Sequence, residues 1–304
     1  MPNPREIHRH MRSVKNIQQI TKAMKMVAAA RLRRAQEKAA SSRPFADKIE
    51  ALLKTALSDR ALAKQISLSD HPLLEVRPVR KTGFIVIAAD KGLAGPCNSN
   101  VLKHSVAEMA ACDEVSVIPV GRKAKEYFQH RGYRIEQSFF GLSDKPDFDY
   151  AEQIGSAAIQ AFTSGEVDEV KLIFTHFKSA LSYTPETVHL LPVLPPEGAA
   201  ALNGDDFQDD RNGPEEIGDV LFEPSASALL ADLVPAYVKN LIYAALMQSA
   251  ASELGARMTA MSSATDNASE LLRSLELSYN KARQAGITRE INEIVGGAEA
   301  LSQE

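Results

Sequence analysis

The chain has 304 residues, of which 44% are hydrophobic and 24% charged, and its net charge is −4. This length and composition predict a globular protein of one or two domains, with no global attraction to nucleic acid or membrane. Its two cysteines, Cys97 and Cys112, fit no zinc or redox spacing and argue against a disulfide framework. No run of 18 apolar residues occurs, so we expect no membrane span, and the basic N-terminus lacks the apolar stretch of a secretory signal.

The first predicted element is a long helix over residues 5–57. Residues 5–43 contain neither Gly nor Pro and are rich in helix-forming Ala, Lys, Arg, Gln and Met. The helix could kink at Pro44 before it resumes. At 1.5 Å per residue it would be roughly 80 Å long. Its apolar residues lie on more than one face, which indicates more than one neighbour. These residues are Ile7, Met11, Val14, Ile17, Ile20, Met24 and Val27.

The middle of the chain has a different period. Short apolar segments rich in β-branched residues alternate there with helical segments, which predicts a mostly parallel, Rossmann-like α/β domain over residues 75–195. We expect strands over residues 83–89, 115–120, 170–177 and 187–194, and helices over 101–111, 122–130 and 150–162. Residues 196–218 are rich in acidic residues, Pro and Gly, and predict a surface loop.

A second long helix is predicted over residues 236–302, which contain no proline. Apolar or small residues recur there at steps of four and three, the signature of a left-handed coiled coil. This seam comprises Met247, Ala251, Leu254, Met258, Met261, Thr265, Ala268, Leu272, Leu275, Tyr279 and Ala282. The expected partner is the N-terminal helix, in an antiparallel pair. The organisation is then a first coiled-coil helix (1–60), the α/β domain, the acidic loop and a second coiled-coil helix (219–304).

The end of the second helix is predicted to differ from the rest. The apolar pattern changes phase near Gly286, so the apolar residues beyond it face a different direction around the helix axis. These residues are Ile287, Ile291, Ile294, Ala298 and Leu301. The second helix is also fourteen residues longer than the first, so roughly 20 Å of it would be unpaired. An unpaired apolar stripe of this kind suits insertion into an apolar sleeve.

Charge is unevenly distributed along the chain. Residues 1–43 carry eleven Lys and Arg against two Glu, and residues 204–223 carry eight acids against one Arg. An acidic protein partner for the basic helix, or simply a solvated face, fits better than nucleic acid or a lipid surface. No aromatic precedes Phe45, and the basic residues surround the helix instead of forming one stripe.

The sequence offers few candidates for chemistry. The turn after the first strand, DKGLAG at residues 90–95, could cradle a phosphate, but it lacks the GK[ST] of a P-loop and reads more simply as a tight turn. The seven histidines show no paired-ligand spacing, and no nucleophile motif occurs. Two other classes stay open: an α/β enzyme with a helical dimerisation arm, and a coiled-coil protein that binds nucleic acid through its basic helix.

Longer motifs carry a family resemblance. Residues 13–34, SVKNIQQITKAMKMVAAARLRR, resemble the N-terminal helix of the gamma subunits of F-type ATP synthases, and residues 278–301, SYNKARQAGITREINEIVGGAEAL, resemble the C-terminal helix of that family. Residues 257–268 (RMTAMSSATDNA), the loop 90–98 and the tetrad FEPS at 222–225 match it as well, in the same order. The sequence is identified as a member of this family.

The resemblance implies a rotor shaft that couples transmembrane proton flow to ATP synthesis or hydrolysis, without catalytic residues, cofactor or metal of its own. The implied partners are the alpha and beta subunits of the hexamer, the epsilon subunit and the membrane c-ring, with no nucleic acid and no direct lipid insertion. The implied location is the cytoplasmic side of the bacterial cell membrane, or the inner-side membrane face of a mitochondrion or chloroplast.

The resemblance also implies roles for individual residues. The residues expected to contact the catalytic subunits are Met24, Lys25, Arg31, Arg33, Arg34, Arg257, Arg283, Gln284 and Thr288. The residues expected to form the bearing tip are Ile287, Ile291, Ile294 and Leu301. The chain departs from the family near Pro96 and Cys97, where a further Gly and an aromatic are usual. It also lacks the cysteine pair of chloroplast-type regulation.

Overall fold

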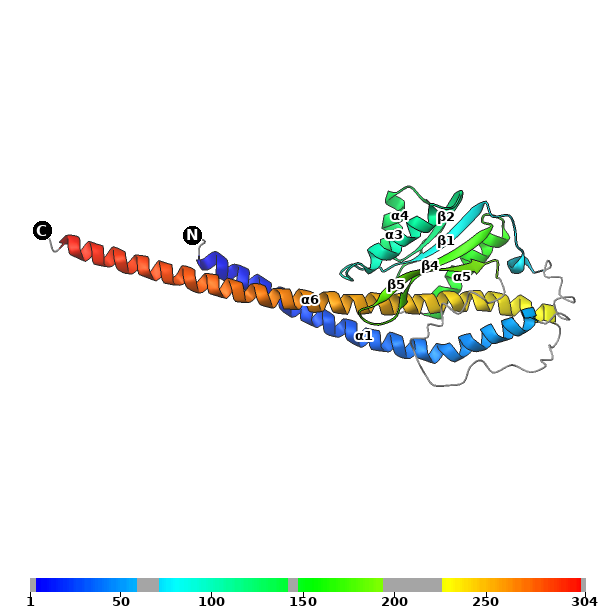
Figure 1. The fold of residues 1–304 in the computed structure, drawn as a ribbon, viewed down its shortest axis with the longest axis horizontal. Coiled ribbons are helices and arrows are strands. Elements are labelled where there is room, and N and C mark those ends of the chain that lie inside the picture. Colours follow the sequence, from blue (N-terminus) through cyan, green and yellow to red (C-terminus); the bar gives the residue numbers. More distant parts are fainter. Residues whose placement is uncertain (1–3, 59–70, 142–146, 194–225, 302–304) are drawn as a thin grey trace. The chain divides into compact units, whose positions relative to one another are not determined.

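A computed structural model describes residues 4–58, 71–141, 147–193 and 226–301 (Figure 1). These residues form two compact units. Residues 1–27 and 258–304 make up the first, called here the helical unit, and residues 28–257 make up the second, called the sheet unit. The sheet unit contains parts of both long helices as well as the α/β domain. The predicted acidic loop 196–218 and the 222–225 tetrad lie outside the described residues.

Two long helices dominate the fold, as the sequence predicts. Helix α1 spans Pro4–Ser58 and continues through Pro44. Helix α6 spans Ala226–Leu301 and therefore begins ten residues before the predicted start at 236, with Pro235 inside it. That predicted start was wrong because proline was taken as the boundary. A proline inside a helix costs about 3 kcal/mol, but Leu230, Val234 and Val238 around it are at most 1% exposed. Each such buried side chain contributes about 1.5–3 kcal/mol.

The sheet has five strands in the order β3-β2-β1-β4-β5. Their bounds are Lys81–Ile87 (β1), Glu114–Val120 (β2), Arg134–Ile135 (β3), Glu169–Phe177 (β4) and Tyr183–Leu191 (β5). The first four are parallel, and β5 returns antiparallel to β4. The sequence predicted β1, β2 and β4 closely and started β5 too late. It missed β3, whose two residues are too short to show a period.

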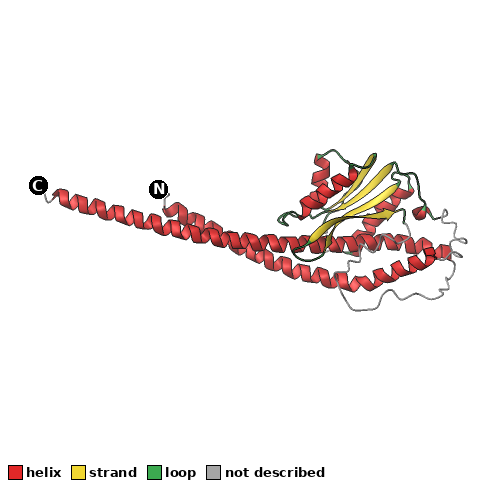
Figure 2. Ribbon diagram, viewed as in Figure 1, coloured by secondary structure: helices red, strands yellow, loops and turns green. Residues whose placement is uncertain are grey.

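Helices cover both faces of the sheet (Figure 2). Helices α3 (Cys97–Met109) and α4 (Arg122–His130) pack on one face, against Phe84, Val86 and Val117. Helix α5 (Phe148–Thr163) and the first part of α6 pack on the other. Helices α5 and α6 cross closely at Gly155, where an added Cβ would lie 3.0 Å from Cγ of Lys239. This crossing sets α6 directly beneath the sheet as part of its core.

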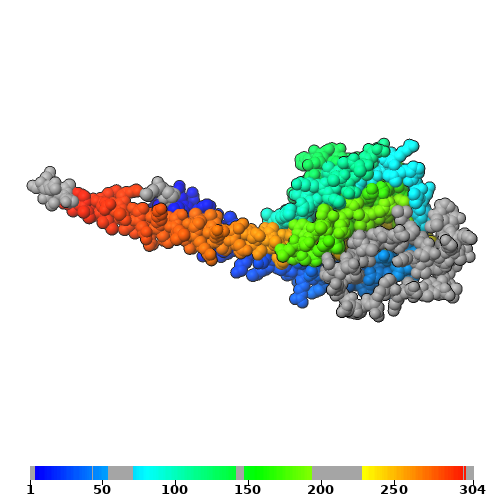
Figure 3. Space-filling model, viewed as in Figure 1, coloured from blue at the N-terminus to red at the C-terminus, as the bar shows by residue number. Residues whose placement is uncertain are grey.

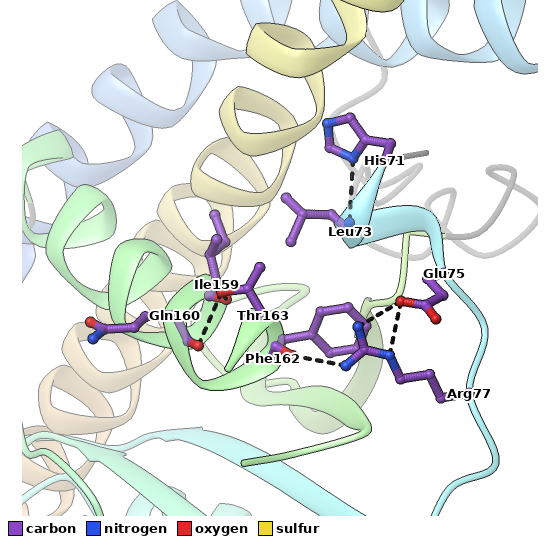
Figure 4. A network of polar contacts seen from close by, with 8 residues as sticks. All are labelled: His71, Leu73, Glu75, Arg77, Ile159, Gln160, Phe162 and Thr163. Atoms are coloured by element: carbon purple, nitrogen blue, oxygen red, sulfur yellow. Dashed lines mark hydrogen bonds and ion pairs between the residues drawn. The ribbon is translucent and has the colours of Figure 1, made fainter. Parts of the chain in front are cut away.

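A short polar network connects the segment before β1 to the end of α5 (Figure 4). After the 3₁₀ turn η2 (Pro72–Leu74), Arg77 donates a 3.1 Å hydrogen bond to the carbonyl oxygen of Phe162 and pairs with Glu75 at 2.6 Å. Its guanidinium carbon also lies 5.0 Å from the centre of the Phe162 ring. The same carbonyl near the end of α5 accepts the amide of Gly165 at 3.2 Å, so Arg77 adds a second hydrogen bond to it and fixes the path of the chain into β1.

Among the described helices, only α6 is long and apolar enough to cross a membrane by length and composition, and 44% of its apolar window is buried within the fold. Core helices of globular proteins pass the same test. Because its first part packs beneath the sheet, the apolar character of α6 is accounted for by the core of the sheet unit.

Candidate functional site: the surface and anchorage of the long helices

In the helical unit, side-chain contacts define the register of α1 against α6. The rings of His8 and Tyr279 lie at a tilt with their centres 6.0 Å apart, Gln18 donates to Ser269 at 2.7 Å, and Lys25 donates to Ser262 at 2.9 Å. As the residue number rises along α1, that of its partner falls by about the same amount. The two helices therefore run antiparallel, as the sequence predicts. The predicted seam of α6 is also confirmed, since Met261 and Ala268 are buried and Leu272, Leu275, Tyr279 and Ala282 are half-buried.

The apolar residues of α1 lie on more than one face, as the sequence predicts. Buried residues recur every seven positions, at Ile7, Val14, Thr21 and, where α1 enters the sheet unit, Ala28. Ile17, Ile20 and Val27 lie outside this seam and are 50%, 58% and 52% exposed. The seam itself includes the polar side chain of Thr21, which a count of apolar residues alone does not find.

The middle of the pair is polar across consecutive layers. Between the Gln18–Ser269 and Lys25–Ser262 contacts, the hydroxyls of Thr21 and Thr265 lie 2.8 Å apart. Polar residues at seam positions lower the stability of a coiled coil but fix its register, because a shifted alignment leaves them unpaired. This stretch therefore defines the alignment of the two helices at the expense of some stability.

The surface of α1 outside the seam carries a second apolar stripe. Ile17, Ile20 and Val27 follow one another on it, with the half-buried Met24 between them. At about 100° per residue, the exposed Lys15 and Lys22 lie on another face of the helix. A row of large exposed apolar side chains in a soluble protein marks a surface that binds another molecule.

Helix α6 continues past the start of α1. The register that pairs residue 8 with 279 and residue 25 with 262 places Pro4 opposite position 283. The described part of α1 thus leaves residues 284–301 of α6 without an α1 residue alongside, which is about 27 Å of helix at 1.5 Å per residue. The red end of α6 and the blue start of α1 show this overhang (Figure 3). Ile287, Ile291 and Ile294 on it are 48%, 54% and 71% exposed; the side chain of Leu301 lies outside the description.

In the sheet unit, α6 fills the place where open α/β sheets usually bind a ligand. Such ligands bind at the carboxyl ends of the strands where the strand order reverses, here between β1 and β4. Ser249 of α6 accepts the amide of Thr175 at 3.2 Å, Gln248 accepts that of Phe177 at 3.1 Å, and Ser252 donates to the Thr175 carbonyl at 3.1 Å. The pairing of β4 with β1 ends at Ile173, so beyond that residue β4 has no strand beside it on the β1 side, and α6 supplies partners for these backbone groups.

A buried ion pair lies beside these contacts. Glu253 and Arg257 are one helical turn apart, their side chains are 5% and 11% exposed, and Arg257 Nη2 lies 2.5 Å from Glu253 Oε1. The same nitrogen donates to the carbonyl oxygen of Gly92 at 3.1 Å. Burial raises the pKa of the neighbouring Cys97 thiol to about 11, with Glu253 adding to the rise. Cys97 is therefore an unreactive small residue here, as the sequence suggests.

The turn over residues 90–95 uses its polar groups within the chain. Asp90 accepts the amide of Arg122 at the start of α4 and the amide of Gly141, both at 3.0 Å. Asn98 accepts the amide of Ala89 at 2.9 Å. The cavity between this turn and α6 measures about 20 Å³, room for roughly one water. The turn is thus a structural junction between β1, α3, α4 and α6. Among the described residues, no group of three His, Cys, Asp or Glu could hold a metal.

Comparison with known proteins assigns this architecture. The sequence matches the family model described as ATP synthase over residues 3–301. The ATP synthase gamma chain of Heliobacterium modesticaldum is 46% identical over 301 residues, 99% of this chain and 100% of that protein. That of Desulforamulus reducens is 45% identical over the same shares of each. The chain belongs to the family of ATP synthase gamma chains.

Solved structures share the fold of this gamma-chain family member. A chain of the central stalk and c-ring structure of the Tetrahymena thermophila mitochondrial ATP synthase is 26% identical, with a TM-score of 0.56 over 81% of this chain and 99% of that one. A chain of the Euglena gracilis mitochondrial ATP synthase has a TM-score of 0.66 at 19% identity, covering 98% of this chain and 94% of that one, which shows the fold alone. The expected family and the expected fold, a coiled coil with an inserted α/β domain, are confirmed.

The contact residues implied by the gamma-chain resemblance occupy different environments. Arg31 and Arg34 are exposed on α1, and Arg33 forms an exposed pair with Glu37 at 3.0 Å. Lys25 is exposed although it reaches Ser262. Arg283, Gln284 and Thr288 are exposed on the last turns of the pair and on the overhang. Arg257 is the exception, because its side chain is turned into the sheet unit.

The sequence alone did not identify the polar residues that attach α6 to the sheet. Gln248, Ser249, Ser252 and Glu253 interrupt an otherwise apolar stretch of helix, and polar residues within such a stretch signal a buried hydrogen-bonding role. Gly255 belongs to the same region, since an added Cβ would lie 3.2 Å from the ring of Phe177 and 3.3 Å from Cα of Ala180. Only the fold shows what these residues contact.

Proposed function

We propose that the chain is the central rotor shaft of an F-type ATP synthase and that the helical unit turns within the hexamer of alpha and beta subunits. The observation that carries the proposal is the helical unit itself. It combines an antiparallel pair of fixed register, a second apolar stripe on α1 and an apolar overhang. Its antiparallel pairing and gamma-chain family membership both suit a shaft that transmits torque.

The role of such a rotor is mechanical. Two helices joined by a seam resist twisting better than one, and their unequal faces present a different surface to each catalytic subunit as the shaft turns. The crevice where an α/β domain would bind a nucleotide is occupied by Gln248, Ser249 and Ser252 of α6. We therefore assign the chain no catalytic step of its own; it couples ion flow to ATP synthesis or hydrolysis in other subunits.

The exposed surfaces suggest the roles of individual residues. Acidic loops of the catalytic subunits would face one group of residues on α1, namely Met24, Lys25, Arg31, Arg33 and Arg34. A further loop of those subunits would contact Arg283, Gln284 and Thr288 on α6. An apolar sleeve at the top of the hexamer would surround the bearing tip, formed by Ile287, Ile291, Ile294 and Leu301. The α/β domain would meet the epsilon subunit and the c-ring. We propose in addition that the chain lies at the cytoplasmic face of the bacterial cell membrane, or at the inner-side membrane face of a mitochondrion or chloroplast, without inserting into lipid.

Purification of the native complex through a tag on this chain tests the proposal. We expect alpha, beta and epsilon subunits to co-purify, with ATP hydrolysis that is lost when the chain is removed. A free homodimer with catalytic activity of its own would support the α/β enzyme class instead. Salt-sensitive binding to DNA, without ATPase subunits, would support the nucleic-acid-binding class.

A photo-crosslinking amino acid tests the assigned contacts within that complex. At position 288, on the exposed overhang, it should form products with alpha or beta subunits. The chain purified without other subunits gives the baseline and should form none. Absence of alpha and beta products in an intact complex would contradict the assignment of this surface.

A further inference from the structure

The turn of α6 at residues 253–257 is held from two sides within the sheet unit. On one side, Ala256 packs with Ala94 and Cys97, and Arg257 reaches Gly92. On the other, Gly255 lies against the loop that joins β4 to β5. This turn is also where α6 passes from the sheet unit into the helical unit. Its attachment therefore determines how firmly the helix is joined to the α/β domain at the exit point.

The Glu253–Arg257 pair contributes a buried charged contact to this attachment. One guanidinium nitrogen bridges the Glu253 carboxylate on α6 and the Gly92 carbonyl on the loop after β1. Hydrogen bonds to charged groups are stronger than neutral ones, and burial strengthens them further. Glu253 is 4% exposed and lines the small cavity with Cys97 and Thr175, so it cannot meet another subunit directly.

We propose that Arg257 is a positioning residue that, oriented by Glu253, locks the 253–257 turn of α6 to the 90–98 loop, so that the helix and the α/β domain turn as one body. This role differs from the one implied by the family resemblance, in which Arg257 contacts a catalytic subunit. The two roles predict different behaviour for Glu253. A contact residue acts through its own exposed surface, whereas a locking pair fails when either member is changed.

The lock itself can be tested in the intact complex, with Arg257→Gln, the near-isosteric Glu253→Gln and the double variant. Cys97 is a built-in probe because burial in the shared cavity holds its pKa near 11 and keeps it unreactive. We expect each single variant to raise the alkylation rate of Cys97 and amide exchange in residues 90–98 by at least about tenfold. The double variant should exceed the larger single effect by less than twofold, and Arg257→Lys, which keeps one charged donor, should recover part of the loss.

Lys123→Gln is the matched control, because Lys123 and Glu126 form an exposed ion pair within one turn of α4, 2.8 Å apart. It should leave Cys97 alkylation and loop exchange at wild-type values. If Arg257→Gln slows turnover while Cys97 and the loop behave as in the wild type, and Glu253→Gln has no effect, Arg257 acts on a partner and the lock is refuted.

The consequence for coupling rests on the proposed rotor function and is measured separately. In vesicles containing the complex, ATP-driven proton pumping should fall at least about twofold more than ATP hydrolysis in Arg257→Gln and Glu253→Gln. A loosened loop with an unchanged pumping-to-hydrolysis ratio would overturn the coupling role. If no ATPase co-purifies with the chain, the rotor function fails, yet the labelling and exchange experiments still decide whether the lock exists.

Discussion

Helix α6 crosses two environments, and the difference between them explains its sequence. In the sheet unit, residues 250–256 are all buried, and the polar ones among them bond to β4 and the 90–98 loop. In the helical unit only one face is covered, with Met261 and Ala268 buried and the remaining faces exposed. The first part is thus fixed on all sides, and the second is fixed along one seam and has exposed faces, which we propose contact other subunits. On that proposal, anchorage and contact are separated along one continuous helix.

A core substitution should show the largest contrast between the two regions. Ile242→Ala in the sheet unit removes a side chain that is 0% exposed beneath the sheet, and should lower the free energy of unfolding by about 3–4 kcal/mol. Leu275→Ala in the half-covered seam should cost less than half as much, because water already reaches that site. Urea denaturation of the purified chain, followed by circular dichroism, compares them. Equal losses would contradict the difference in packing.

Removal of the overhang should affect assembly more than turnover. Deletion of residues 294–304 removes Ile294 and Val295, which are 71% and 55% exposed and available to a sleeve. Burial of two such side chains is worth about 3 kcal/mol in total, roughly a 100-fold change in complex lifetime. The dissociation rate of the purified complex and its ATP hydrolysis rate should be measured in parallel. An unchanged lifetime with abolished turnover would refute the bearing role.

The polar layers of the helical unit should tolerate apolar replacement. Thr21→Val with Thr265→Val removes both members of a hydrogen-bonded pair, and such exchanges are nearly neutral or stabilising, within about 1 kcal/mol. Thermal unfolding followed by circular dichroism should give a midpoint equal to or above that of the wild type. If the pair specifies register, disulfide trapping between cysteines placed at positions 8 and 279 should become less efficient in the double variant. A midpoint well below the wild type would show that the polar pair contributes more than alignment.

The smallest effect concerns the half-buried carboxylate of Asp168, just before β4. Asp168 accepts the amides of Lys81 at 2.9 Å and Arg80 at 3.0 Å, and these bonds hold its pKa below the usual value. A carboxyl with a lowered folded pKa stabilises the fold above its unfolded pKa of about 3.9, and this contribution is lost as pH falls through the folded pKa.

Asp168→Asn should therefore lower stability at neutral pH by less than about 1 kcal/mol, because the group is solvent-screened. The difference from wild type should disappear in acid. Urea denaturation midpoints of both proteins, measured from about pH 7 down to about pH 2, would show this convergence. Glu166→Gln, a nearby exposed carboxylate, is the control. A difference that persists in acid would mean that the charge of Asp168 is irrelevant.

The sequence by itself determined the elements whose signals are local. The seven-residue period of α6, the absence of breakers in α1 and the alternation of apolar strands with helices all depend on residues near one another in the chain. They were sufficient for both long helices and most of the sheet, whereas the family was indicated by the resemblance of longer motifs, such as residues 13–34 and 278–301. The unequal helix ends were also foreseeable, although the register makes the overhang longer than the fourteen residues first expected.

Tertiary structure alone decided which of several local options the chain adopts. Pro235 is a plausible helix boundary in sequence, and only the buried surface of Leu230, Val234 and Val238 carries the helix through it. Ile17 and Ile20 suit a seam as well as Thr21 does, until Thr265 is placed opposite. Arg257 resembles an exposed contact residue, until Glu253 and the Gly92 carbonyl enclose it. In each case the contact that decides is made by a residue distant in the sequence, or by a nearby residue that distant segments bury. A local period in the sequence cannot reveal either kind of contact.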